Sequence, residues 1–247
     1  MDDFVYGRNS VLESLKNDRP ANKLLVARGA GTGSVKEIVA LARDKRLPVQ
    51  EVDRKTLDAT TENANHQGVL LYLAAKAYVE IEEILALAAG KGEPPFILVL
   101  DEVGDPHNLG ALLRTADGAG VHGVVIPRRR AVGLTGAVAK AAAGAVEYVP
   151  VSRVANLTQA LDGLKKAGCW VVGADMNGTD YPYNVDLRGP LVLVIGGEHK
   201  GLGRLVREHC DLVVKLPMLG RGGSLNAGVA GSILMYEALR QRSGLEK

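Results

Sequence analysis

Polar side chains that could act together in one site lie in three segments of the second half of the chain. Asn108 and Arg114 stand six residues apart, about one and two-thirds turns of a helix. Glu198 follows a glycine pair at the end of an aliphatic run, and Ser224 and Asn226 precede a long helical pattern. A guanidinium pairs with phosphate, and amide, hydroxyl and carboxylate groups can orient it. A helix cap and a surface arginine are the ordinary explanations for single members, but their joint occurrence favours a binding site.

Glycine is enriched around the same segments. The chain has 30 glycines, where the usual share of about 7% predicts about 17. Fourteen of them lie in three stretches, 104–123, 196–203 and 220–231. Because glycine lacks a Cβ atom, it permits positive φ and close backbone approach. The clusters therefore indicate either loops wrapped around a ligand or a turn-rich α/β protein.

The elements that must position these residues are aliphatic strands alternating with helical patterns. We predict strands at 96–103, 123–126, 148–151, 169–174, 191–195 and 212–216, and helices at 109–119, 135–143, 157–167, 202–209 and 226–240. This alternation is typical of a mostly parallel sheet covered on both faces. Such sheets bind ligands beyond the carboxyl ends of their strands. The glycine clusters follow the first, fifth and sixth strands, so we expect the site at that edge.

A smaller α/β unit precedes this sheet. We predict helices at 10–17 and 35–46, the second capped by Ser34, and strands at 23–27, 49–52 and 69–73. An acidic segment with a helical run at 79–89 follows and ends in glycines and prolines, which stop a helix. The sequence thus predicts domains at 1–75 and 96–247, joined by a linker at 76–95.

Composition excludes several classes of protein. Hydrophobic residues make up 47% and charged residues 23%, which is ordinary for a globular chain and argues against collagen, coiled coil and disorder. No aliphatic run approaches the ~20 residues of a membrane helix. The two cysteines and five histidines lack the spacing of a metal site. With an acidic start to the chain, these features predict a cytoplasmic protein with no membrane span and no metal.

Two other chemistries have partial sequence support. Gly29 to Gly33 could begin a dinucleotide loop, which makes a nicotinamide-dependent oxidoreductase an alternative, but the third glycine of that fingerprint falls on Ser34. Ser224 lacks the flanking pattern of a hydrolase nucleophile.

The three motifs, taken in order, resemble those of the SpoU/TrmH class of SPOUT RNA 2′-O-methyltransferases. The pattern is N-x5-R from Asn108, I-G-x-E-x-K-G from Ile195, and L-P-M from Leu216 followed by S-L-N and a closing helix. Residues 6–9 (YGRN) and 65–69 (NHQGV) resemble the small L30e-like substrate-binding domain of these enzymes. The string DPHNLGA at 105–111 is most similar to the bacterial 23S rRNA guanosine-2′-O-methyltransferase branch.

The resemblance implies an α/β fold with a small L30e-like N-terminal domain and a SPOUT α/β-knot domain. In that knot domain, the C-terminal loops of a mostly parallel sheet form a trefoil knot. The resemblance also implies a homodimer. It places S-adenosyl-L-methionine in the knot, with Gly196, Leu216 and Leu225 lining the cofactor site.

The implied activity is ribose 2′-O-methylation of a guanosine in 23S rRNA. Arg114 would be the central catalytic residue, surrounded by Asn108, Glu198, Ser224 and Asn226. Because a guanidinium stays protonated in proteins, we expect Arg114 to bind phosphate and to stabilise the developing alkoxide rather than to act as a base. A tRNA guanosine 2′-O-methyltransferase and a non-catalytic RNA-binding module are the alternatives.

Binding of RNA would need local basic surface, because the net charge is only +2. We expect that surface from Arg8, Arg28 and the triplet Arg128, Arg129 and Arg130. His199, where relatives often have glycine, and the pair Gly222 and Gly223 depart from the family pattern and bear on loop rigidity and cofactor affinity.

Overall fold

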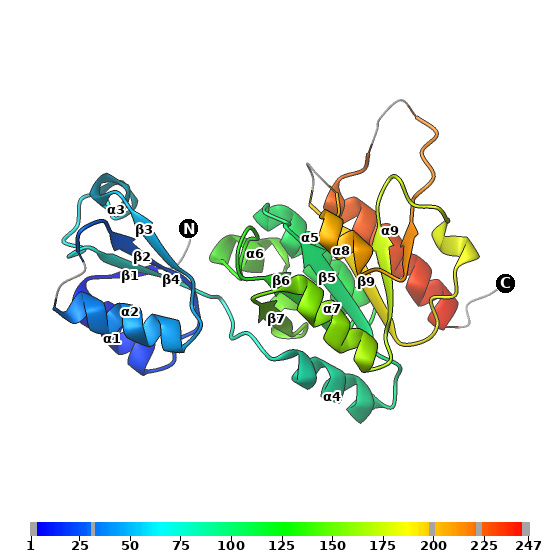
Figure 1. Cartoon of the computed structure of the whole chain (residues 1–247), viewed down its shortest axis with the longest axis horizontal. Coiled ribbons are helices and arrows are strands. Elements are labelled where there is room, and N and C mark those ends of the chain that lie inside the picture. The colour runs from blue at the N-terminus through cyan, green and yellow to red at the C-terminus, as the bar shows by residue number, and fades with distance from the viewer. Residues whose placement is uncertain (1–3, 31–32, 198–200, 221–223, 244–247) are drawn as a thin grey trace. The chain divides into compact units, whose positions relative to one another are not determined.

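The computed structural model describes residues 4–30, 33–197, 201–220 and 224–243. The chain divides into two compact units (Figure 1). Unit 1 comprises residues 1–77 with 133–137, and unit 2 comprises residues 78–132 with 138–247. No helix within the described ranges combines the length and apolar character needed to cross a membrane.

Unit 1 contains a mixed four-stranded sheet in the order β1-β4-β2-β3. Its strands are β1 (Phe4–Tyr6), β2 (Ala21–Ala27), β3 (Val49–Val52) and β4 (Val69–Leu73), and its helices are α1 (Arg8–Lys16), α2 (Ser34–Asp44) and α3 (Arg54–Thr60). Only the β2–β3 pair is parallel. Helices α1 and α2 lie on one face of the sheet and α3 on the other (Figure 1).

The alternation of side chains along the strands explains these two layers. Leu24 and Leu71 point to the face that buries Val11 and Ile38 from α1 and α2. Their neighbours along the strands point to the opposite face, where Leu57 of α3 covers them. A strand period of two residues therefore fixes which helix each residue meets.

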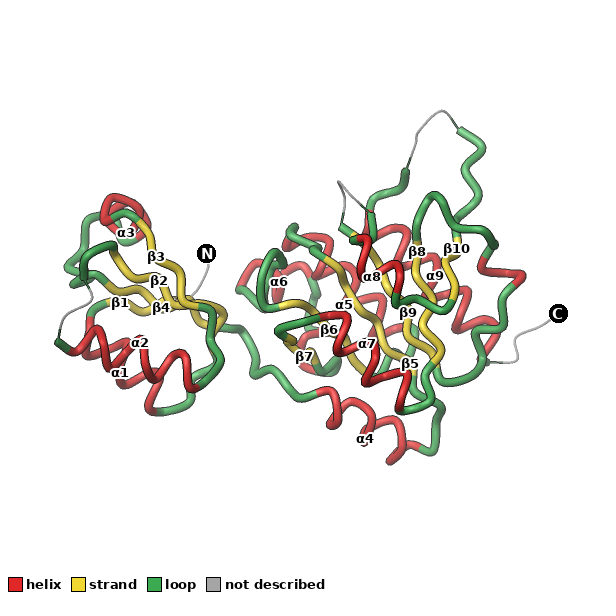
Figure 2. The backbone as a smooth tube through the Cα atoms, viewed as in Figure 1, coloured by secondary structure: helices red, strands yellow, loops and turns green. Residues whose placement is uncertain are grey.

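Unit 2 is built on a six-stranded, wholly parallel sheet in the order β10-β8-β9-β5-β6-β7 (Figure 2). The strands are β5 (Phe96–Asp101), β6 (Gly123–Pro127), β7 (Val151–Val154), β8 (Trp170–Ala174), β9 (Leu191–Gly196) and β10 (Leu212–Val214). The helices among them are α4 (Ile81–Lys91), α5 (Pro106–Gly118), α6 (Gly136–Ala141), α7 (Leu157–Lys166), α8 (Arg204–Glu208) and α9 (Ala227–Arg242). The predicted α/β fold class, with a small N-terminal sheet domain and a mostly parallel second sheet, is confirmed.

Both faces of the parallel sheet are covered. Side chains of α4, α7 and α8 pack on one face against a buried aliphatic cluster that includes Ile97 and Val192. Helices α5 and α9 pack against each other and contact β6 and β9, respectively. The chain adds β6 and β7 on one side of β5, then returns to place β9 on the other side. Sheets of this kind bind ligands where the strand order reverses.

Several predicted boundaries are wrong. Ser34 is the first residue of α2 and not its cap, since Gly33 precedes the helix and makes no side-chain cap. The strand predicted at 148–151 lies instead at Val151–Val154, because 145–147 form a short 3-10 turn that leaves Tyr148 75% exposed. Strand β10 ends at Val214, two residues earlier than predicted. The short elements β1 and α3 were not predicted.

Candidate active site

Helix α5 begins directly beyond the carboxyl end of β5. Asp105 caps it, with Oδ1 accepting a hydrogen bond from the backbone N–H of His107 at 3.0 Å. Pro106 suits the first helical position because its φ is already helical. Asn108 therefore does not cap the helix. It lies in the first turn, and its side chain is buried.

Asn108 and Asn226 converge on Gly228. Asn226 caps α9, with Oδ1 accepting from the backbone N–H of Val229 at 3.2 Å. A Cβ atom at residue 228 would lie 3.1 Å from the side-chain oxygen of each asparagine. Glycine at this position therefore permits the two amides to approach the start of α9 together.

The amide nitrogen of Asn108 is buried and has no hydrogen-bond partner among the described residues. Leaving such a donor unpaired costs about 1–3 kcal/mol. An acceptor atom of a bound ligand would satisfy this buried donor, because no described side chain accepts a hydrogen bond from it.

Close packing of α5 on α9 holds this arrangement. Thr115 Oγ1 and Ser232 Oγ are 2.9 Å apart, and a Cβ atom at Gly231 would lie 2.5 Å from Leu112 Cδ2. Arg114 precedes Thr115 on α5 and is exposed. In the described part of the chain it forms no ion pair or hydrogen bond, so its guanidinium is available to a substrate.

The glycine pair at the end of β9 is packed by backbone on both sides. A Cβ atom at Gly196 would lie 2.1 Å from the carbonyl carbon of Gly201, and one at Gly197 would lie 2.7 Å from the carbonyl oxygen of Glu102. Gly196 also stands in register with Asp101 of β5. The turn of the chain itself thus requires glycine here. A contact between Gly196 and cofactor stays a prediction.

Two carboxylates near this turn were missed by the sequence analysis. Asp101 is buried and accepts from the backbone N–H of Gly203 at 2.7 Å, and its burial raises the pKa of its carboxyl. Asp175 pairs with Arg207 at 2.8 Å. Burial opposes ionisation of Asp175, but hydrogen bonds from the Asn177 N–H and from Arg207 outweigh it and lower the pKa. An acidic residue ending an otherwise aliphatic strand was the available signal for Asp101.

For the remaining predicted site residues, no hydrogen bond to Asn108 or Asn226 is found among the described residues. Leu216 follows β10 and is half-buried, whereas Ser224 and Leu225 precede the α9 cap and are exposed. Glu198, together with His199, Gly222 and Gly223, lies outside the described residues. The structure therefore brings Asn108, Asn226 and the α5–α9 packing together and leaves the rest of the set as predictions.

The predicted RNA-binding arginines are divided between the two units. In unit 1, Arg8 donates to the carbonyl oxygen of Gln67 at 3.2 Å, and Arg28 pairs with Asp53 at 3.1 Å. In unit 2, Arg128 donates to the carbonyl oxygen of Arg153 at 3.1 Å, Arg130 pairs with Glu102 at 3.1 Å, and Arg129 is exposed. The pairs Arg28–Asp53 and Arg130–Glu102 lie at the surface, where such pairs are weak.

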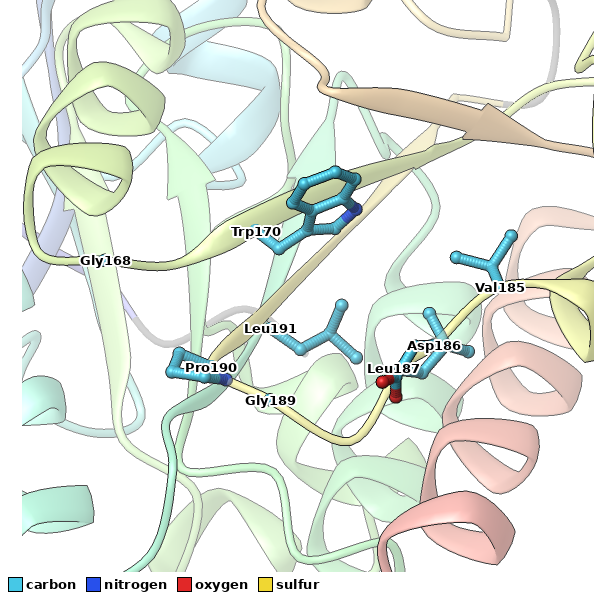
Figure 3. Close-up of a pocket in the computed structure, with 8 residues that line it drawn as sticks. All are labelled: Gly168, Trp170, Val185, Asp186, Leu187, Gly189, Pro190 and Leu191. Carbon is cyan, nitrogen blue, oxygen red and sulfur yellow. The ribbon is translucent and has the colours of Figure 1, made fainter.

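A hollow of about 390 Å³ lies at the other end of the parallel sheet. Trp170 and Leu191 line it from the first residues of β8 and β9, and residues 185–187 close it from the connecting loop (Figure 3). Because ligands of such sheets bind beyond the carboxyl ends, this hollow is not the candidate site. Among the residues that the structure describes, no group of three or more His, Cys, Asp or Glu could hold a metal ion.

Comparisons with known proteins match both parts of the chain. Residues 95–236 match the SpoU rRNA methylase family, and residues 4–79 match the RNA 2′-O ribose methyltransferase substrate-binding family. YacO of Bacillus subtilis strain 168, assigned to the TrmH family of tRNA/rRNA methyltransferases, is 49% identical over 241 residues, which is 98% of this chain and 96% of YacO.

Solved structures give two further similarities. The AdoMet-bound rRNA methyltransferase of Sinorhizobium meliloti superposes with a TM-score of 0.61 at 25% identity. The superposition covers 99% of this chain and 88% of the S. meliloti chain. The TrmH/SpoU tRNA modifying enzyme of A. aeolicus gives a TM-score of 0.55 at 27% identity. That superposition covers 67% of this chain and 85% of the A. aeolicus chain.

Proposed function

Because the chain belongs to the SpoU/TrmH family of tRNA/rRNA methyltransferases, we propose that it methylates the ribose 2′-oxygen of a guanosine in 23S rRNA. The observation that carries the proposal is the convergence of Asn108 and Asn226 at the α5–α9 contact. Arg114 lies further along α5, is exposed, and has no ion-pair or hydrogen-bond partner among the described residues. This cluster lies near the carboxyl ends of β5 and β9, where the strand order reverses.

The methyl donor is S-adenosyl-L-methionine, which supplies an electrophilic methyl group on a positively charged sulfur. The S. meliloti relative binds this cofactor. One feature of this chain fits such a ligand: the amide nitrogen of Asn108 is buried and has no hydrogen-bond partner among the described residues. Gly196, Leu216 and Leu225 line the cofactor site, with the leucine side chains supplying apolar contact.

Arg114 acts on the RNA. Its guanidinium binds a phosphate next to the target ribose and stabilises the negative charge that develops on the 2′-oxygen. It does not accept the 2′-hydroxyl proton, because arginine stays charged in proteins. That proton leaves to solvent water as the oxygen is methylated. Asn108 would orient Arg114 or the ribose, and Glu198 would hold Arg114 or a neighbouring amide. Ser224 and Asn226 would fix the knot loop before α9 and the nucleotide. Positioning of the ribose oxygen carries much of the catalysis.

The choice of rRNA over tRNA is supported by the extent of the matches. The rRNA methyltransferase of S. meliloti covers nearly the whole chain, whereas the tRNA modifying enzyme of A. aeolicus leaves about a third of it unmatched. A substrate-binding region at residues 4–79 accounts for a share of that size. Methylation of a tRNA guanosine is the second candidate, since the B. subtilis relative is assigned to tRNA or rRNA.

The catalytic protein is a homodimer, with the C-terminal segment threaded as a trefoil knot. Helix α9 supports the dimer because Val229, Ile233 and Tyr236, spaced four and three residues apart, are 48%, 44% and 54% exposed. An apolar stripe of this kind is typical of an interface. Introducing a charge by Ile233→Glu should convert the dimer to a monomer in light scattering. A wild-type monomer would contradict this part of the proposal.

Incubation with tritiated S-adenosyl-L-methionine and total RNA tests the activity. We expect label in 23S rRNA in a form that resists alkaline hydrolysis, because a 2′-O-methyl group blocks attack on the neighbouring phosphate. RNA that binds the protein but gains no label would instead support a non-catalytic RNA-binding module. Label confined to tRNA would favour the second candidate.

A further inference from the structure

The sheet of unit 1 has one face that its helices only partly cover. Helices α1 and α2 pack on the opposite face, and α3 covers this one over Leu25, Ala27 and Leu70. Near β1 the same face carries aromatic side chains from two neighbouring strands. Phe4 and Tyr6 come from β1, and Tyr72 comes from β4.

These side chains form an ordered group with one lysine. Phe4 and Tyr72 are register partners, and Tyr72 is in turn the register partner of Lys23 on β2. The Phe4 ring meets the Tyr72 ring edge-on at 6.0 Å and lies 6.2 Å from the Tyr6 ring. Lys23 Nζ lies 4.7 Å from the centre of the Tyr72 ring. Phe4, Tyr6, Tyr72 and Lys23 are called the aromatic platform below.

Cross-strand packing explains part of this arrangement, but not the exposure of Tyr6. Its register partner is Leu70, which is fully buried, yet Tyr6 itself is 39% exposed. Lys23 is exposed as well. An exposed aromatic ring beside a cation suits a nucleobase, because every base has a flat face to stack and each nucleotide carries a negative phosphate.

We propose that the aromatic platform stacks unpaired bases of the RNA substrate, with Lys23 contacting the adjacent phosphate. This inference rests on the proposed function, since the platform lies within the segment that matches a substrate-binding family. Sheet surfaces with exposed aromatic side chains bind single-stranded RNA in this way.

The occupant is a single strand rather than a duplex. Bases in a duplex are already stacked on one another and present only their edges, so a protein ring cannot reach their faces. The platform would therefore bind a loop or bulge of the substrate RNA.

Fluorescence anisotropy with full-length protein tests the platform. The probes are a single-stranded RNA of about 12 nucleotides carrying 2-aminopurine and a duplex of the same sequence. We expect Tyr6→Ala to bind the single strand about tenfold more weakly and to leave duplex binding unchanged. Tyr6→Phe should keep wild-type affinity because it keeps the ring, and quenching of 2-aminopurine should persist only in variants that keep it.

Two further variants complete the test. Lys23→Gln should reduce the slope of log affinity against log salt by about one for the single strand. Tyr148→Ala removes an exposed tyrosine of unit 2 and should have no effect.

The platform is overturned if Tyr6→Ala binds the single strand as tightly as the wild type, or if it weakens single strand and duplex equally. Methyl transfer by the wild-type protein is measured in parallel. An active wild type with unchanged Tyr6→Ala binding refutes the platform alone. An inactive wild type refutes the proposed function, whereas the anisotropy result still decides whether the platform stacks bases.

Discussion

The side-chain oxygens of Asn108 and Asn226 both lie 3.1 Å from the position that a Cβ atom of residue 228 would take. One asparagine belongs to the first turn of α5, and the other caps α9. Their approach joins two helices that are far apart in the sequence, and the amide nitrogen of Asn108 there is buried without a hydrogen-bond partner among the described residues.

Asn108→Ala should reduce activity without unfolding the protein. Removing a buried amide whose nitrogen has no partner should change the free energy of unfolding by less than about 1 kcal/mol. Methyl transfer should fall by at least about 100-fold, as when a preorganised donor is lost. Urea denaturation and single-turnover transfer measure the two effects.

Asn156→Ala is the matched control. Asn156 caps α7 through hydrogen bonds from Thr158 and Gln159, so its loss should cost about 1 kcal/mol of stability and leave transfer intact. If Asn108→Ala behaved like this control, its assignment to the site would be wrong.

Arg114→Ala should abolish methyl transfer while keeping cofactor binding. The side chain is exposed and makes no bond to a described residue, so stability should change by less than about 0.5 kcal/mol. Calorimetric titration with S-adenosyl-L-methionine measures the binding. Arg188→Ala, on a surface ion pair with Asp186, should retain full turnover. Near-normal turnover of Arg114→Ala would refute its catalytic role.

Gly196→Ala should disrupt the turn after β9. Its new methyl group would overlap the backbone of Gly201, which cannot move as a side chain end can. We expect a loss of about 1–3 kcal/mol in the free energy of unfolding, measured by urea denaturation.

Gly163→Ala provides the contrast, because nothing lies within 4 Å of its Cβ position in α7. In a helix interior that change should stabilise the protein by about 0.5–1 kcal/mol. A tolerated alanine at 196 would mean that the turn is looser than the structure describes.

Lowering the pH should decrease the free energy of unfolding, because His122 is buried in its neutral form. Its ring is buried, with Nδ1 accepting from the Phe96 N–H at 3.0 Å and Nε2 placed 3.0 Å from Glu93 Oε2. Burial lowers the pKa of His122 below its ordinary value of 6.5, because the neutral ring is favoured. The unfolded chain therefore binds more protons as the pH falls through 6.5, and stability should decline by at most about 1.4 kcal/mol per pH unit.

His122→Asn should flatten this pH dependence, since an amide oxygen can accept from Phe96 without titrating. Denaturation curves at several pH values between about 5 and 7 measure the slope of the free energy of unfolding against pH. Equal slopes for the wild type and His122→Asn would show that another group causes the acid sensitivity.

Long aliphatic runs made the parallel sheet predictable. Strands β5, β6 and β9 are buried along nearly their whole length, so their apolar residues are continuous in the sequence. The three residues of β1 carry too little pattern to predict. Strand β7 was misplaced because Tyr148 and Val149, which follow the 3-10 turn at 145–147, resemble the start of a strand.

The candidate site was predictable in its residue types but not in its contacts. Helical spacing relates Asn108 to Arg114, because both lie on α5. No local pattern relates Asn108 to Asn226, because tertiary packing of α5 on α9 brings them together. Similarly, the sequence suggested that Gly196 accommodates a ligand, whereas the structure reveals that the Gly201 backbone already occupies the space of its missing side chain.

Mapping of ribose methylation in 23S rRNA and tRNA, from cells with and without this protein, tests the central claim most directly. We predict that one 23S rRNA guanosine loses its 2′-O-methyl group without the protein, and that the wild-type gene restores it but Arg114→Ala does not. Unchanged rRNA methylation, or restoration by Arg114→Ala, would contradict the account.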